Sequence, residues 1–450
     1  MKQFFVTFTN NQNAFYPGQT ISGTVVLELD EPTTARGVRL ILQGRAHVHW
    51  SEQHGSGQHR HTVHYSDSEV YMNHSLTLWG KQEGDRQGDN PELPLGMHTF
   101  PFSFVLPSAL PSSFESYNGH IRYYVTAQVD RPWKFDYKSK RPFTVIEYVD
   151  VNQPALLVPM RSENDKHLCC LCCKSGPIKL SASIDRSAYC PGESVVVSAN
   201  AENLTNREMR GIRAQLIAVK TLYARGHRHC TRHVVCEMMG EPIAPQGFGN
   251  WSEQAMPLPP TAPSIKSCRI LDLSHYIQVC IVIPRGINLK IHFPILLGSI
   301  PLRPQLQRQQ SAPTYIDNSR MGAEALPPPA AMLPASANPI VPTAPPTYAE
   351  ATDETFNIAD QDDTNTFGNL QYAPAYPFAG VAPPPAAAAA APYPPAAAAP
   401  YPPPAASDGG APYPPSGGYV GAPYPPAQAG GGEIPLQPMP QDLPTKSPIS

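Results

Sequence analysis

The sequence has little charge, and neither sign prevails. Charged residues make up 15% of the 450 positions, against about a quarter in an average protein, and the formal net charge is −3. Residues 1–302 hold 29 basic and 25 acidic side chains, whereas residues 303–450 hold 4 and 11. Neither part resembles a phosphate-binding domain, so the composition argues against a nucleic-acid partner.

Long apolar segments are also absent. No run approaches the roughly 20 apolar residues of a membrane span, and the apolar stretch near the start, MKQFFVTF, is too short for the apolar part of a secretory signal. We therefore expect a cytosolic protein whose nine cysteines are mostly reduced thiols.

The last third of the chain lacks core-forming residues. All four Trp and all nine Cys precede residue 303, whereas 33 of the 55 prolines follow it. A segment of Pro, Ala, Gly, Ser and Thr has too little apolar surface to offset its ordering entropy. We predict a disordered tail over residues 303–450, with local polyproline II structure.

The first 302 residues predict short β-strands. Phe100, Phe102 and Phe104 alternate with other residue types, as a half-buried strand does, and turn pairs such as Asn118-Gly119 recur. An internal repeat relates AFYPGQTISGTVVLEL at residues 14–29 to SAYCPGESVVVSANAE at residues 187–202. We predict an all-β fold of two similar antiparallel sandwiches in tandem. The predicted boundaries are a first sandwich at 1–150, an inter-domain segment at 151–175, a second sandwich at 176–302 and the tail at 303–450.

The chain resembles the arrestin-domain-containing proteins, or alpha-arrestins. The matching stretches, in the expected order, are FYPGQTISGTVVLEL, LPLGMHTFPFSFVLPSALPSSFE, GHIRYYVTAQVDRPW, LCCLCCKSGPIKLSASIDRSAYCPGE and FPILLGSIPL. They span nearly all of residues 1–302. The resemblance implies two arrestin-like, immunoglobulin-like sandwiches with no catalytic residues and no cofactor.

The tail contains one strict PPxY motif, formed by Pro345, Pro346 and Tyr348. A polyproline II helix has about three residues per turn, so Pro345 and Tyr348 share a face that an aromatic groove can bind. WW domains bind such peptides, and the resemblance implies HECT-type ubiquitin ligases with WW domains as partners. Chance occurrence in a Pro- and Tyr-rich tail is the alternative. Family members usually carry two copies, whereas residues 312–315 and 373–376 keep only one proline, which leaves paired binding in doubt.

A PTAP motif overlaps the PPxY motif. It consists of Pro342, Thr343, Ala344 and Pro345, and it resembles the peptides that the UEV domain of the ESCRT-I complex binds. Chance in a tract of Pro, Ala and Thr is again the alternative. Because Pro345 belongs to both motifs, we predict that one tail cannot hold a WW domain and a UEV domain at once. The pair of motifs is similar to that of one alpha-arrestin whose tail carries both.

Four copies of APYPP follow, at residues 391–395, 399–403, 411–415 and 422–426. Weak SH3-type sites, calcium-dependent penta-EF-hand ligands, spacers and a weakly self-associating low-complexity linker all remain open interpretations.

Four cysteines cluster between the predicted sandwiches, at Cys169, Cys170, Cys172 and Cys173. S-palmitoylation beside Leu168 and Leu171 would hold the protein at a membrane. A zinc site is a second interpretation, although tetrahedral sites usually draw ligands from two separated segments. A packed strand edge is the third.

Two groups of histidines, each in a stretch that we interpret as a polar hairpin loop, have loose metal-ligand spacing. They are His47, His49, His54, His59, His61 and His64, and, with two cysteines, His227, His229, Cys230, His233 and Cys236. We favour solvated loops over metal sites in both cases, and no catalytic triad, phosphate loop or carboxylate pair stands out. The basic run Lys134, Lys138, Lys140 and Arg141 is either a cargo or phosphate patch or a solvated strand face.

Together these features predict a non-enzymatic adaptor. Residues 1–302 would hold membrane-protein cargo such as a receptor or transporter. The tail would recruit a ligase at a flexible reach of about 35–40 Å from Leu302, so that cargo is ubiquitylated and sorted through endosomes to lysosomes. The alternative is a scaffold that recruits ESCRT-I for vesicle budding at the plasma membrane. We expect a cytoplasmic protein that is recruited to plasma membrane and endosomes.

Overall fold

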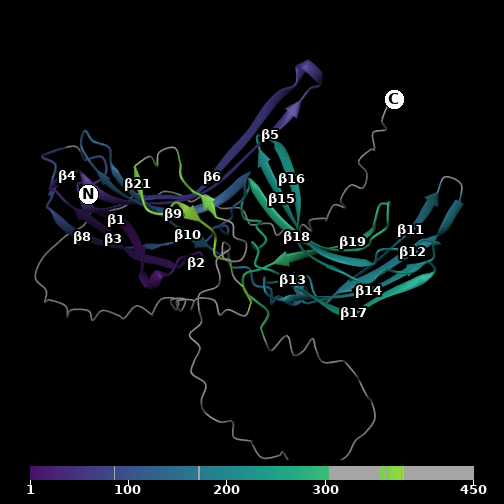
Figure 1. Ribbon diagram of the computed structural model, residues 1–450. Coiled ribbons are helices and arrows are strands. Elements are labelled where there is room, and N and C mark those ends of the chain that lie inside the picture. The colour runs from purple at the N-terminus through teal and green to yellow at the C-terminus, as the bar shows by residue number, and fades with distance from the viewer. Residues whose placement is uncertain are drawn as a thin grey trace, which may run out of the picture. The chain divides into compact units, whose positions relative to one another are not determined.

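Two β-sandwiches follow one another along the chain in the computed structural model (Figure 1). The structure describes residues 1–85, 87–170, 173–303, 355–360, 363, 365–376 and 378–379. Within these residues there is no α-helix; the only helical turns are the short 3-10 segments η1 (Thr9–Asn11), η2 (Gly57–His59) and η3 (Pro154–Leu156). The predicted all-β fold class is confirmed.

The first sandwich consists of two sheets whose long strands pair antiparallel. One has the strand order β1-β3-β8 and the other the order β2-β10-β9-β5-β6. A two-stranded ribbon, β4 with β7, lies apart from both sheets. The strands are β1 (Gln3–Phe8), β2 (Ala14–Phe15), β3 (Thr20–Leu29), β4 (Thr33–Thr34), β5 (Gly37–His54), β6 (His61–Gly80), β7 (Glu92–Leu93), β8 (Gly96–Val105), β9 (Gly119–Asp130) and β10 (Tyr137–Val145).

The second sandwich repeats this plan. Its sheets have the orders β11-β12-β14-β17 and β13-β19-β18-β15-β16. The strands are β11 (Met160–Cys170), β12 (Cys173–Ile184), β13 (Ala188–Tyr189), β14 (Ser194–Asn203), β15 (Ile212–Ala224), β16 (His227–Met239), β17 (Gly247–Pro257), β18 (Leu271–Ile281) and β19 (Leu289–Leu297).

The repeated Pro-Gly motif has the same structural role in both sandwiches. A two-residue strand pairs in parallel with the last long strand, β2 with β10 and β13 with β19. The chain then turns at Gly18 (φ 79°) or Gly192 (φ 91°) and enters the first long strand of the opposite sheet. Both turns need a positive φ, which glycine adopts without steric cost. The internal repeat predicted from the sequence is therefore a structural repeat.

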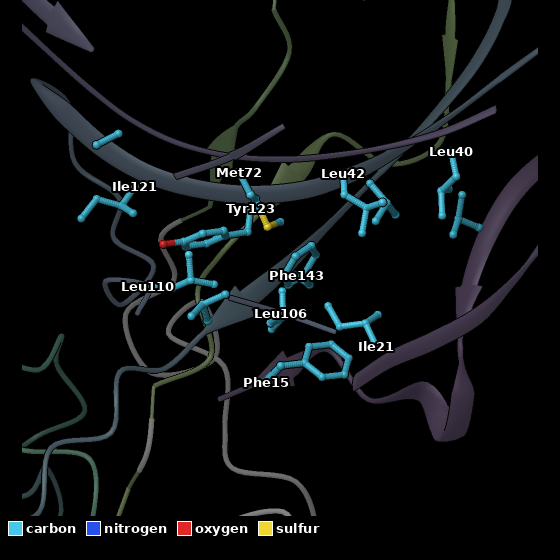
Figure 2. Close-up of a cluster of buried hydrophobic side chains, with 14 of the residues drawn as sticks. Phe15, Ile21, Leu40, Leu42, Met72, Leu106, Leu110, Ile121, Tyr123 and Phe143 are labelled. Carbon is cyan, nitrogen blue, oxygen red and sulfur yellow. The ribbon is translucent and has the colours of Figure 1, made fainter. Parts of the chain in front are cut away.

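Alternating side chains form the core of the first sandwich. Along β5, Val38, Leu40 and Leu42 are fully buried, and Phe102 of β8 faces them from the other sheet. Tyr123 is also fully buried among these apolar side chains (Figure 2). Its hydroxyl donates a 2.8 Å hydrogen bond to the Pro111 carbonyl oxygen, so the only polar atom of the side chain is satisfied.

The second sandwich begins earlier than the sequence suggested. Residues 160–170, assigned to an inter-domain segment, form β11, which pairs antiparallel with β12 from Met160↔Ile184 onward. The strand MRSENDKHLCC is polar because it lies at the sheet edge and most of its described side chains reach solvent. Hydrophobic alternation, which marks the central strands, is therefore missing from it.

Candidate functional site

The sequence motifs of the tail lie largely outside the described residues. This holds for the PTAP motif at Pro342–Pro345, the PPxY residues Pro346 and Tyr348, and the APYPP copies. Of the cysteine cluster, Cys172 lies outside them as well. Cys169 and Cys170 end β11, and Cys173 begins β12, so these three belong to a β-hairpin of the second sandwich. Their acylation remains a prediction.

One segment of the tail packs against the first sandwich. Residues 355–379 include the short strands β20 (Phe356–Asn357), β21 (Thr366–Phe367) and β22 (Gln371–Tyr372). β21 runs parallel to β10, with Lys138 opposite Thr366 and Ser139 opposite Phe367 (Figure 1). β20 and β22 pair antiparallel with each other. The prediction of a disordered tail is therefore wrong for this stretch, because β10 offers it a sheet edge to pair with.

The edge of β10 that faces away from β9 is only partly covered by the sandwich itself. β2 pairs with it at Thr144 and Val145 and leaves the preceding residues open. The open backbone accepts β21, which is the way extended peptides add to a sheet edge. A cavity of about 500 Å³ remains between residues 139–144 of β10 and residues 368–373 of the tail.

A buried lysine at this edge binds the tail. The ammonium of Lys140 donates to Asp360 at 2.8 Å, to Asp363 at 2.9 Å and to the Ile358 carbonyl oxygen at 3.1 Å. It also lies 4.1 Å from the ring centroid of Tyr124. Its side chain is only 2% exposed. The three N–H donors of the ammonium all find their acceptors in the tail. The interpretation of the basic run as a solvated strand face is therefore wrong for Lys140.

Two further groups hold the carboxylate of Asp360. Arg45 of β5 pairs with it, and the Tyr124 hydroxyl donates to it at 3.4 Å. Burial opposes its ionisation, but the hydrogen bond and charge of Lys140 and the charge of Arg45 outweigh burial, so the pKa of Asp360 lies below its ordinary value. Burial raises the pKa of Tyr124 to about 12, which keeps this phenol protonated as a donor.

Aromatic side chains anchor the second half of the docked segment. Tyr372 is buried, and its hydroxyl lies 3.1 Å from Thr144 Oγ1 and 3.3 Å from the Phe143 carbonyl oxygen that it donates to. Tyr376 is buried within the core cluster of the first sandwich. Beyond it, the Ala379 backbone NH donates to the Pro191 carbonyl oxygen of the second sandwich at 2.7 Å. The surface that binds the tail thus combines the open edge of β10, the buried ammonium of Lys140 and the two sites that bury Tyr372 and Tyr376.

Sequence reasoning overlooked this segment, although a signal was present. No proline occurs between Pro346 and Pro374, and six of the eleven tail acids lie in that gap. A stretch without proline that combines acids with Phe, Ile and Tyr is not low-complexity linker. Two other cations of the predicted basic run have different surroundings from Lys140. Arg141 donates to the Val6 carbonyl oxygen at 2.7 Å, whereas Lys134 is exposed.

Most of the predicted histidine sites lie on strands and not in loops. His47, His49 and His54 belong to β5, and His227 and His229 belong to β16. The rings of Trp50 and His229 stack with centroids 5.6 Å apart, a contact between the two sandwiches. In the part of the chain that the structure describes, no group of three or more His, Cys, Asp or Glu is placed to hold a metal ion. Nor does any helix there have the length and apolar character to cross a membrane.

Comparison with known proteins defines the class of this architecture. Residues 4–152 match the family described as Arrestin (or S-antigen), N-terminal domain, and residues 174–302 match its C-terminal domain counterpart. The two sandwiches are thus a tandem pair of arrestin domains.

Curated relatives define the family. Arrestin domain-containing protein 4 of Homo sapiens is 34% identical over 306 residues, which cover 67% of this chain and 72% of the relative. Arrestin domain-containing protein 17 of Caenorhabditis elegans is 32% identical over 318 residues, 68% and 72% of the two chains. Thioredoxin-interacting protein of Mus musculus is 27% identical over 397 residues, 86% and 94% of the two chains. The chain belongs to the arrestin-domain-containing, or alpha-arrestin, family, as the sequence resemblance predicted, and this membership supports an adaptor role in general.

Proposed function

We propose that this protein is a trafficking adaptor that links membrane-protein cargo to HECT-type ubiquitin ligases with WW domains. Pro345, Pro346 and Tyr348 are the ligase-binding residues. The arrestin domains carry the cargo, which is then ubiquitylated, internalised and sorted through endosomes. The protein itself catalyses no reaction, and it moves between the cytoplasm and the plasma membrane or endosomes.

The docked tail segment is the observation that carries this proposal. Tyr348 precedes Phe356, the first residue of β20, by eight residues. An extended chain spans at most about 3.6 Å per residue, so Tyr348 lies within about 29 Å of Phe356, where the docked segment begins. The ligase motif is therefore tied to the sandwiches at Leu302 on one side and at Phe356 on the other. A ligase bound there works close to the arrestin domains, and hence to their cargo.

A second candidate function rests on the overlapping motif Pro342–Pro345. In this alternative the protein recruits the UEV subunit of ESCRT-I and acts as a scaffold for vesicle budding at the plasma membrane. Both functions use Pro345, so each tail serves one partner at a time. The two differ in the outer residues, because Tyr348 belongs to one motif and Thr343 to the other.

Two substitutions in the full-length chain separate the candidates. Tyr348→Ala removes the aromatic anchor and lowers the affinity for a ligase WW domain roughly tenfold or more, while UEV binding is retained. Thr343→Ala has the reverse effect. Titration of the purified protein with each isolated domain measures both affinities. If the unaltered chain binds no WW domain of any HECT ligase tried, the adaptor proposal fails, and UEV binding alone would favour the scaffold.

A further inference from the structure

The loop between β9 and β10 exposes two large aromatic side chains at one end of the first sandwich. Trp133 is 101% exposed and Phe135 is 81% exposed, although the strands on either side are largely buried. Aromatic side chains of this size are usually at least partly buried, because their burial from water is strongly favourable. Two neighbouring exceptions in one loop therefore need an explanation.

Trp133 is also backbone-strained. Its φ is +61°, in the left-handed region that glycine adopts freely and that a bulky residue adopts only at a cost. Strain of this kind persists where surrounding contacts impose it, and it concentrates at functional sites. For folding alone, Gly or Asn would suit position 133 better than Trp.

Polar contacts within the loop hold it in this conformation. Asp136 accepts from the Arg131 backbone NH at 2.8 Å and from Gln128 Nε2 at 2.6 Å. The guanidinium of Arg131 donates from Nε to the Phe135 carbonyl oxygen at 2.9 Å and lies 3.5 Å from the ring centroid of Tyr137. The loop is thus closed without help from the side chain of Trp133, which is left pointing into solvent.

The charge of the loop is positive. The loop itself carries two cations, Arg131 and Lys134, and one acid, Asp136, whose two carboxylate oxygens already accept hydrogen bonds. Lys134 lies between the two exposed aromatics and is itself exposed. A cavity of about 410 Å³ beside the loop extends the apolar surface through Phe135, Tyr137 and Phe367 of the docked tail.

We propose that this β9–β10 loop is a membrane-docking element for an anionic phospholipid surface. Trp133 and Phe135 enter the interfacial layer, where the flat amphipathic indole is favoured, and Lys134 lies at the level of the lipid phosphates. A loop that exposes two aromatics around one exposed cation suits this occupant, because lipid headgroups offer both an interfacial layer for the rings and phosphates for the lysine.

Vesicle binding by the full-length chain tests the proposal. The unaltered protein is expected to bind vesicles of phosphatidylcholine with phosphatidylserine more strongly than vesicles of phosphatidylcholine alone, and less strongly at high salt. Trp133→Gly removes the inserted ring and relieves the backbone strain, so the variant folds at least as well. Its partition coefficient should fall roughly tenfold or more, as the loss of one buried large side chain predicts. Lys134→Ala should lower binding roughly fivefold on the anionic vesicles only.

A matched control and a depth measurement complete the test. Tyr117 is 88% exposed and precedes the first residue of β9, whereas the β9–β10 loop follows the last. Tyr117→Ser should therefore leave vesicle binding unchanged. Brominated lipid chains should quench the fluorescence that is lost in Trp133→Gly. The proposal is overturned if the unaltered chain ignores anionic vesicles, if Tyr117→Ser and Trp133→Gly weaken binding equally, or if Trp133 is not quenched. None of these readouts involves a ligase, so they stand apart from the adaptor proposal.

Discussion

The docking of the tail depends most on Lys140, and its removal is the sharpest perturbation that the structure offers. In Lys140→Ala, Asp363 keeps no cationic partner among the residues that the structure describes, and Asp360 keeps Arg45 and the Tyr124 hydroxyl. Breaking a buried ion pair by deleting one partner costs about 3–5 kcal/mol. The carboxylate of Asp360 is 31% exposed, which places the cost near the lower limit, about 3 kcal/mol. The docking equilibrium should therefore shift toward release about 100-fold.

Hydrogen exchange measures this shift directly. The amide of Ala375 reports docking, because it donates to Thr144 Oγ1 of β10 at 3.0 Å and should be protected only while the segment is docked. Its exchange in Lys140→Ala should accelerate by up to the same factor of about 100. Amides of β5 should keep their protection, because this strand pairs with β6 and β9 and not with the tail.

A surface ion pair provides the control. Lys179 pairs with Glu202 at 3.1 Å, and both side chains are about half exposed. Such a pair contributes about 0–1 kcal/mol, so Lys179→Ala should not change exchange in residues 356–375. The reasoning is refuted if the segment is protected in the unaltered chain and equally protected in Lys140→Ala. It is also refuted if both lysine variants accelerate exchange alike.

Three further outcomes follow from buried groups. Burial lowers the pKa of His120 to about 2 and of His275 to about 3, so below pH 6.5 the unfolded chain binds protons at these histidines and the folded chain does not. The free energy of unfolding should therefore fall below pH 6.5, by roughly 2 kcal/mol for each histidine at pH 5, and urea titrations showing equal stability at pH 7 and pH 5 would contradict this. Gly23→Ala should destabilise the first sandwich by about 1–3 kcal/mol, because the new Cβ would lie 2.2 Å from the Thr7 carbonyl oxygen; an unchanged melting temperature would show that β1 can move away. Tyr372→Phe should weaken tail docking by about 1 kcal/mol through the lost hydroxyl contacts with β10, and hydrogen exchange should be faster in the docked segment but not in β9. Equal exchange in Tyr372→Phe and in the unaltered chain would mean that the hydroxyl contributes nothing to docking.

Local patterns in the sequence determined much of the architecture. Alternation at Phe100, Phe102 and Phe104 predicted a strand because side chains of a strand point to opposite faces, and all three lie on β8 and pack in or against the core of the first sandwich. The repeated Pro-Gly pairs predicted equivalent turns because glycine is the residue that adopts their positive φ. The linear motifs around Pro345 are likewise a matter of sequence alone, since a short extended peptide carries its binding groups within a few residues.

The tertiary structure decided what local patterns cannot carry. Lys140 was one cation in a basic run until the fold placed Asp360, 220 positions further along the chain, against it. The sequence around Trp133 gives no sign that its ring is exposed, and only the closed loop shows that it points into solvent. The polar strand β11 needs its partner β12 to be recognised. These features depend on contacts between residues that are far apart in sequence, or on which surface the fold leaves uncovered. Periodicity within a segment indicates neither of these, because it reflects only the neighbours along the chain.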